Sequence, residues 1–104
     1  MQQLTQDKWR EELDKSEKAV ILDVRTPQEC AEGIVPNAIE IDILNPESFI
    51  SEIEKLDKDK DYFIYCRSGS RSAQACNVME QMGFNSTHNL LGGMLEWNGN
   101  VKQK

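Results

Sequence analysis

Residues 61–76, DYFIYCRSGSRSAQAC, contain the pattern that decides the fold. The apolar run 62–65 is typical of a short buried strand, and an amphipathic helical pattern extends from Ser72 to Met82. Cys66 stands between the two, at the start of a tract of small and basic residues. The sequence therefore predicts a thiol at a strand-to-helix turn, close to the positive end of a helix.

The tract that follows this thiol predicts an anion-binding loop. Unpaired N–H groups at a helix N-terminus and the helix dipole both favour negative charge. The same field, with two arginines nearby, favours the thiolate of the cysteine over its thiol. Glycine in the tract gives the backbone the freedom to curl around the sulfur. We therefore expect Cys66 to be the nucleophile, and we expect its anionic ligand to be bound by Arg67, Ser68, Gly69, Ser70, Arg71 and Ser72.

Helix and strand patterns alternate along the whole chain. Strands are predicted at 19–24, 38–43, 62–65 and 87–90; helices are predicted at 5–15, 46–56 and 72–82, with a short helix after Pro27 and a helical turn around Trp97. Such alternation predicts an α/β fold, with a mainly parallel sheet and helices on both faces. The 104 residues show no linker or internal repeat, so we expect one domain over residues 1–104.

Asp23 and Arg25 follow the predicted strand 19–24. In open α/β sheets the functional crevice lies at the carboxyl ends of the strands. The segment with Asp23 and the loop that begins at Cys66 are therefore expected to be neighbours. We expect Asp23 and Arg25 to form an ion pair that supports the loop from behind.

Composition limits the function further. The chain is 38% hydrophobic and 29% charged, as is usual for globular proteins, and its net charge of −6 argues against a nucleic-acid partner. No apolar stretch is long enough to span a membrane, and no signal peptide is visible. Three cysteines without an export signal indicate a reducing compartment, so we expect a cytoplasmic protein. We also expect a monomer.

Several segments resemble the motifs of rhodanese-like domains. LDVRTPQE at 22–29 and EGIVPNA at 32–38 are similar to the N-terminal signature of that family. YCRSGSRS at 65–72 resembles its active-site loop, and LGGMLEW at 91–97 resembles its C-terminal segment. The resemblance implies the single-domain rhodanese fold, with a five-stranded parallel sheet flanked by helices. It also implies sulfurtransferase chemistry through a cysteine persulfide, without a cofactor.

Two positions depart from the family pattern. Ile34 stands where the family often has His, and Cys30 stands where it usually has an aromatic residue. We expect both to affect local packing rather than the chemistry.

The expected reaction begins with attack of the Cys66 thiolate on the outer sulfur of a donor such as thiosulfate, and sulfite leaves. The loop N–H groups then hold the anionic persulfide, until cyanide or a thiol takes the sulfur. Arg67 or Arg71 is expected to pair with the sulfonate of the donor. A persulfide-donating or sulfur-accepting protein is the other expected partner.

The length of the loop argues against a competing function. Cysteine-dependent phosphatases need Cys-x5-Arg, whereas here Arg71 comes one place too early and Ser72 occupies the arginine position. Two alternatives stay open: a persulfide relay that takes sulfur from a cysteine desulfurase, and a non-catalytic binding module. We interpret His88, Cys30 and Cys76 as structural residues, and no Cys/His spacing resembles a metal site.

Overall fold

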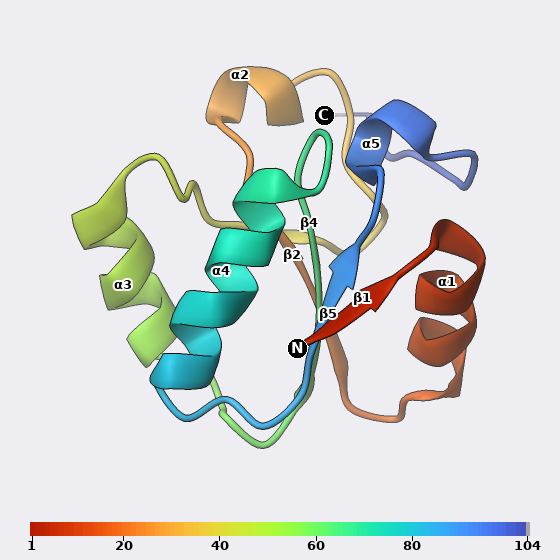
Figure 1. Ribbon diagram of the computed structural model, residues 1–104. Coiled ribbons are helices and arrows are strands. Elements are labelled where there is room, and N and C mark those ends of the chain that lie inside the picture. Colours follow the sequence, from red (N-terminus) through yellow and green to blue (C-terminus); the bar gives the residue numbers. More distant parts are fainter. Residues whose placement is uncertain (104) are drawn as a thin grey trace.

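A computed structural model describes residues 1–103 and contains one five-stranded sheet, with strand order β1-β5-β4-β2-β3 (Figure 1). Every strand pairing in the sheet is parallel. The strands are β1 (Gln2–Leu4), β2 (Ala19–Asp23), β3 (Ile39–Glu40), β4 (Asp61–Tyr65) and β5 (Thr87–Leu90). The predicted α/β fold is confirmed, and the sheet is wholly parallel.

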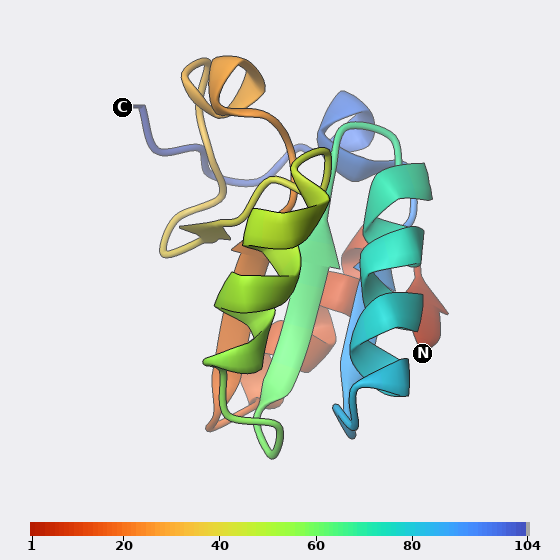
Figure 2. The same cartoon turned by 90° about the vertical axis from the view of Figure 1, so that its left-hand side faces the viewer.

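Helices cover both faces of the sheet. They are α1 (Gln6–Lys15), α2 (Pro27–Cys30), α3 (Pro46–Glu54), α4 (Ser70–Gln81) and α5 (Gly93–Glu96). Figure 2 shows α3 and α4 side by side on one face, with α1 behind the sheet on the other. The short helices α2 and α5 lie at the carboxyl ends of the strands (Figure 1). Within residues 1–103, no helix combines the length and the apolar character needed to cross a bilayer.

The central strand β4 explains why there are two hydrophobic cores. Tyr62 and Ile64 belong to the core under α3 and α4, whereas Phe63 and Tyr65 belong to the core under α1. On the second side, Trp9 of α1 meets Phe63 edge to face, with ring centroids 5.7 Å apart. A strand buried on both faces needs a continuous apolar run, and this is the pattern that β4 shows in the sequence.

The largest differences from the sequence prediction concern β1, β3 and the start of α4. The edge strand β1 was not predicted, because three residues with two glutamines carry no strand pattern and gain their order from pairing with β5. The strand predicted at 38–43 is reduced to Ile39–Glu40. Helix α4 begins at Ser70 rather than at Ser72, because Gly69 adopts φ 107° and serves as its N-cap.

Candidate active site at the carboxyl end of the sheet

The two polar segments predicted to be neighbours are joined by backbone hydrogen bonds. Strands β2 and β4 pair in parallel, and Asp23 lies opposite Tyr65 in the register. One residue further along, the Val24 N–H donates to the Tyr65 carbonyl at 3.1 Å. Cys66 therefore leaves the sheet beside Val24, where the crevice of a parallel sheet is expected.

The loop after β4 wraps around the sulfur of Cys66. The Gly69 N–H donates to Sγ at 3.1 Å, and the Ser72 hydroxyl lies 3.3 Å from the same atom. Cys66 is only 1% exposed, whereas Ser68 and Ser70 lie on the outer surface of the loop. A thiolate at this position sits in a ring of donors from the chain itself.

These donors act on the protonation of Cys66. Burial raises the pKa of the Cys66 thiol, but the Ser72 hydroxyl and the N–H groups of the loop outweigh it, so the pKa is lower than usual. By contrast, burial raises the pKa of Cys30 to about 12 and that of Cys76 to about 12. Cys66 is therefore the one cysteine of the three whose environment favours the thiolate.

Helix α5 supports the loop from the other side. The Met94 N–H donates to the Cys66 carbonyl and the Leu95 N–H donates to the Arg67 carbonyl, both at 3.0 Å. This approach depends on Gly93, where a Cβ atom would lie 2.5 Å from the Arg67 carbonyl oxygen. Gly93 also has φ 51°, a conformation that favours glycine. The Gly92-Gly93 pair therefore allows the backbone of α5 to lie close to the backbone of the cysteine loop.

A buried amide network holds Ser72, and the sequence analysis missed it. Asn89 of β5 is 1% exposed, and its Oδ1 accepts a short 2.5 Å hydrogen bond from Ser72 Oγ. Its Nδ2 donates to Gln3 Oε1 at 2.6 Å and to the Gly69 carbonyl at 3.1 Å. The available signal was an amide side chain inside the predicted strand 87–90, three residues before Gly92.

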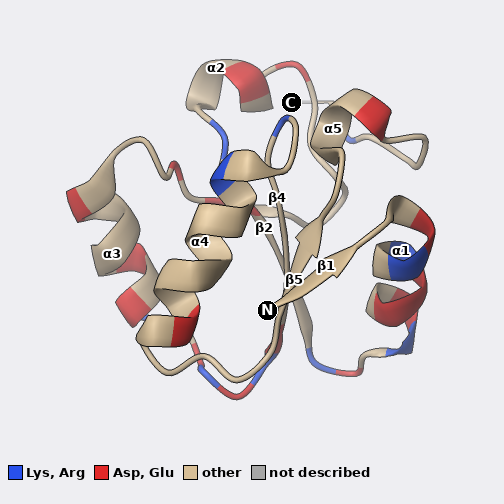
Figure 3. Ribbon diagram, viewed as in Figure 1, with Lys and Arg blue, Asp and Glu red and all other residues tan. Residues whose placement is uncertain are grey.

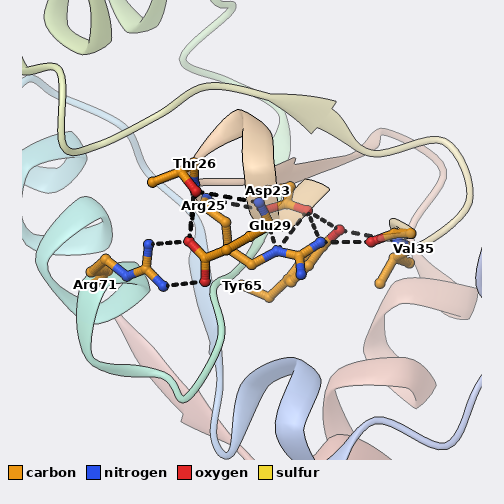
Figure 4. Close-up of polar contacts among 8 residues, drawn as sticks. Asp23, Arg25, Thr26, Glu29, Val35, Tyr65 and Arg71 are labelled. Carbon is orange, nitrogen blue, oxygen red and sulfur yellow. Dashed lines mark hydrogen bonds and ion pairs between the residues drawn. The ribbon is translucent and has the colours of Figure 1, made fainter. Parts of the chain in front are cut away.

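The predicted ion pair between Asp23 and Arg25 is present and buried. Arg25 Nη2 lies 2.7 Å from Asp23 Oδ2 and also donates to the Gly33 carbonyl at 2.7 Å (Figure 4). The Tyr65 hydroxyl donates to the same carboxylate at 2.6 Å and accepts from the Val35 N–H at 3.0 Å. Burial alone would lower the pKa of Arg25, but Asp23 holds it above its ordinary value. The pair ties the end of β2 to β4 and to the segment after α2.

The two loop arginines differ in a way that the sequence did not predict. Arg71 makes a forked ion pair with Glu29, with both Nη–Oε distances 2.8 Å (Figure 4). Arg67 has no ion-pair partner among residues 1–103 and lines a cavity of about 360 Å³. The sequence did not indicate that Arg71 has an ion-pair partner within the chain itself. The capping-box spacing Thr26-x-x-Glu29 indicates a role for Glu29 at the start of α2, but it does not indicate the contact with Arg71.

Comparisons with known proteins agree with this geometry. The chain matches the family of the rhodanese-like domain over residues 5–100. The chain belongs to the rhodanese-like domain family. It is 41% identical over 96 residues to "Putative sulfurtransferase YtwF" of Bacillus subtilis, and the matched region covers 91% of this chain and 88% of that protein. It is 41% identical over 85 residues to a sulfurtransferase of Allochromatium vinosum, covering 82% of this chain and 77% of that one.

A solved structure of the same family has the same fold. The crystal structure of a rhodanese-like domain protein from Staphylococcus aureus superimposes with a TM-score of 0.85 at 31% identity, covering 100% of this chain and 99% of that one. The resemblance inferred from the sequence motifs is thus confirmed over nearly the whole chain.

In this rhodanese-like domain, the two unusual positions are built into the packing. Ile34 forms an antiparallel bridge with Lys102, with N–H to carbonyl distances of 3.0 and 2.7 Å. Cys30 is fully buried in α2. His88 stacks on Phe63 at 4.3 Å, and its Nδ1 lies 3.0 Å from the Tyr62 carbonyl. None of these contacts involves Cys66.

Proposed function

We propose that this rhodanese-like domain is a sulfurtransferase that moves a sulfane sulfur through a persulfide on Cys66. The donor is thiosulfate or a persulfide, and the acceptor is cyanide or a thiol. The observation that carries the proposal is the position of Cys66 Sγ, which lies within reach of the Gly69 N–H and the Ser72 hydroxyl. Such an arrangement stabilises an anionic sulfur without a protein base.

The first step forms a bond between Cys66 Sγ and the outer sulfur of the donor. The thiolate supplies the electron pair, and the donor's own sulfur–sulfur bond breaks. That bond's electron pair leaves with sulfite when the donor is thiosulfate, or with a thiolate when the donor is a persulfide. The lowered pKa of Cys66 increases the fraction of this side chain that is ionised, and the thiolate reacts without losing a proton.

The second step returns the electrons to Cys66. Cyanide or a thiolate attacks the terminal sulfur of the persulfide, and the sulfur–sulfur bond breaks toward Sγ. The leaving group is the Cys66 thiolate, which the Gly69 N–H and the Ser72 hydroxyl stabilise as they did before the reaction. The protein therefore supplies the same stabilisation in both half-reactions.

The loop suits a sulfur atom better than a phosphoryl group. A phosphatase needs an arginine to close its ring over the phosphate, and here Ser72 stands at that place with its hydroxyl 3.3 Å from the sulfur. Arg71 is occupied by Glu29. The second candidate, a persulfide relay between proteins, uses the same cysteine. The ion pair of Arg71 favours it, because Glu29 already holds an arginine that could bind the sulfonate of thiosulfate.

Mass spectrometry of the purified protein after exposure to thiosulfate tests the proposal. We expect a gain of one sulfur atom that maps to the peptide with Cys66, and cyanide should remove it as thiocyanate. The peptides with Cys30 and Cys76 are internal controls and should gain no sulfur, because burial keeps both as thiols. A Cys66→Ser variant should gain none. If wild-type Cys66 took up sulfur from neither thiosulfate nor a persulfide, a binding module would be the better interpretation.

A further inference from the structure

The ion pair between Glu29 and Arg71 lies beside the cysteine loop and has no part in the sulfur transfer as described. The fork of Arg71 faces both carboxylate oxygens of Glu29 at 2.8 Å. Both side chains are mostly covered, with 21% and 25% of their surfaces exposed. A paired fork of this kind is the geometry with which arginine also binds the oxygens of a sulfonate. Glu29 thus occupies the place that an anionic donor would take on Arg71.

Glu29 is itself held in place from the other side. Its Oε1 accepts from the Thr26 N–H and from the Thr26 hydroxyl, both at 3.1 Å, in a capping box in which Thr26 is the N-cap of α2 and Glu29 is the third helical residue (Figure 4). The hydrogen bonds from Arg71, opposed by burial and joined by those from Thr26, lower the pKa of Glu29 to about 2. The carboxylate is therefore charged at any pH at which the protein would act.

The other cations at the crevice do not restore a positive field. Arg25 is committed to Asp23. Arg67 has no ion-pair partner within residues 1–103, but the cavity that it lines also contains Glu29 and Glu32. Figure 3 shows the same mixture, with basic segments at the start of α4 and in the loop before it, and acidic residues in and after α2. A doubly charged small anion gains little from such a surface.

We propose that Glu29 determines donor specificity: by holding Arg71, it disfavours sulfonate donors such as thiosulfate relative to persulfides of thiols. This inference rests on the proposed sulfur transfer through Cys66. Both donors undergo the same exchange at Sγ, and they differ in the leaving group, which is sulfite for thiosulfate and a thiolate for a persulfide. The sulfite group carries anionic oxygens that compete with Glu29 for Arg71, whereas a neutral thiol such as mercaptoethanol carries none.

The test compares two donors on Glu29→Gln. Glutamine keeps the oxygen that caps α2 but removes the charge that holds Arg71. The measurement is the second-order rate constant for sulfur uptake by Cys66, followed by mass spectrometry. With thiosulfate we expect the constant to rise about three- to tenfold, as the loss of one nearby negative charge at a partly exposed site allows. With mercaptoethanol persulfide, which has no sulfonate, we expect a change within about twofold.

Two further variants separate this role from general charge and from folding. Glu32→Gln removes the same charge from the same cavity without touching an ion pair, so it should raise the thiosulfate rate much less. In an Arg71→Ala background, Glu29→Gln should lose its effect on thiosulfate, because the two residues act as one unit. Thermal unfolding of each variant checks that α2 and the loop are intact.

Equal changes with both donors in Glu29→Gln would overturn the inference, since Glu29 would then only position the loop. An equal gain in the thiosulfate rate constant from Glu32→Gln would also overturn it, because the effect would then come from any negative charge in the cavity and not from the ion pair with Arg71. These results differ from a failure of the proposed function, in which wild-type Cys66 would take up sulfur from neither donor.

Discussion

The Ser72 hydroxyl has one proton and three acceptors within reach. Cys66 Sγ lies at 3.3 Å, the Gly69 carbonyl at 3.2 Å and Asn89 Oδ1 at 2.5 Å. The side-chain N–H groups of Asn89 do not donate to the Ser72 oxygen, because Gln3 and Gly69 accept them. The proton of Ser72 is therefore shared between an amide oxygen and the sulfur, and it can turn toward the sulfur when Cys66 loses its own proton.

The first prediction concerns the reactivity of Cys66. Its pKa is lowered because the Ser72 hydroxyl and the loop N–H groups outweigh burial, so iodoacetamide should still react rapidly at pH 6.5. Cys30 and Cys76 should not react under the same conditions, since burial raises the pKa of each to about 12. Peptide mapping after timed alkylation measures all three thiols in one sample. A pH profile for Cys66 like that of a free cysteine would contradict the role of the ring of donors.

The second prediction separates Ser72 from the backbone donors. Ser72→Ala removes the hydroxyl that favours the thiolate, so the pKa of Cys66 should rise. The midpoint of the alkylation rate against pH measures this shift. The variant should also be less stable by about 1–3 kcal/mol, because Asn89 Oδ1 is left buried without a donor. Ser51→Ala, on the exposed side of α3, is the control and should change neither quantity. An unchanged midpoint in Ser72→Ala would mean that the loop N–H groups suffice.

At the scale of elements, the site depends on how closely α5 approaches the loop. The first N–H groups of α5 donate to the carbonyls of Cys66 and Arg67, and Gly93 permits the distance. The loop is thus fixed from two directions: α4 begins at its end, and α5 supports its start.

The third prediction follows from this contact. Gly93→Ala would place a Cβ atom 2.6 Å from the Cys66 carbonyl oxygen, so the loop or α5 must move. We expect sulfur transfer to fall by at least tenfold, because displacements of about 1 Å in a site have effects of that order or more. Gly83→Ala is the matched control: its φ of 98° also disfavours alanine, but its nearest neighbour is the flexible Lys58 side chain at 3.6 Å. Both variants should lose stability, and only Gly93→Ala should lose transfer. Equal transfer rates would show that the loop tolerates the shift.

Elements whose pattern is local were predictable from the sequence. The runs that form β2, β4 and β5 and the periodic faces of α1, α3 and α4 all appear at the predicted places. The edge strand β1 was missed, because its order comes from β5, far along the chain. The strand predicted at 38–43 was too long, since the strand ends at Glu40. Ile41 fits the alternating pattern because it is buried and its N–H donates to the Asp23 carbonyl, but it lies beyond the strand.

The candidate site was predictable in the same unequal way. Cys66 and its loop follow from a strand, small residues and a helix in direct succession. Glu29 and Asn89 reach the loop from other elements, and their partners are 42 and 17 residues away in the chain. Nothing in the local spacing indicates such contacts, because they depend on how β2, β4 and β5 lie in the sheet.

At the scale of the whole molecule, acidic and basic residues both lie on helices and in turns, and basic segments also lie at the start of α4 and in the loop before it (Figure 3). Because the net charge is −6, protonation of carboxylates reduces the repulsion among negative charges as the pH falls. Carboxylates with lowered pKa act in the opposite direction, since their charged form stabilises the fold. Glu29 is one of them through Arg71, and Asp61 is another, through the hydroxyl of Ser16.

The last prediction is the dependence of stability on pH. The pKa of Glu29 is about 2 in the folded protein and ordinarily about 4.3, so its ion pair contributes fully above the ordinary value. The contribution should disappear as the pH falls from about 4.3 toward 2, because the unfolded chain then binds the proton first. Urea unfolding of wild type and Glu29→Gln measures it: the difference in unfolding free energy should be about 1–2 kcal/mol at pH 6, allowing for partial exposure, and should vanish near pH 2. Glu32→Gln should show no such convergence, since among residues 1–103 its carboxylate has no ion-pair partner. A difference between wild type and Glu29→Gln that stayed constant from pH 6 to pH 2 would show that it does not come from the ion pair between Glu29 and Arg71.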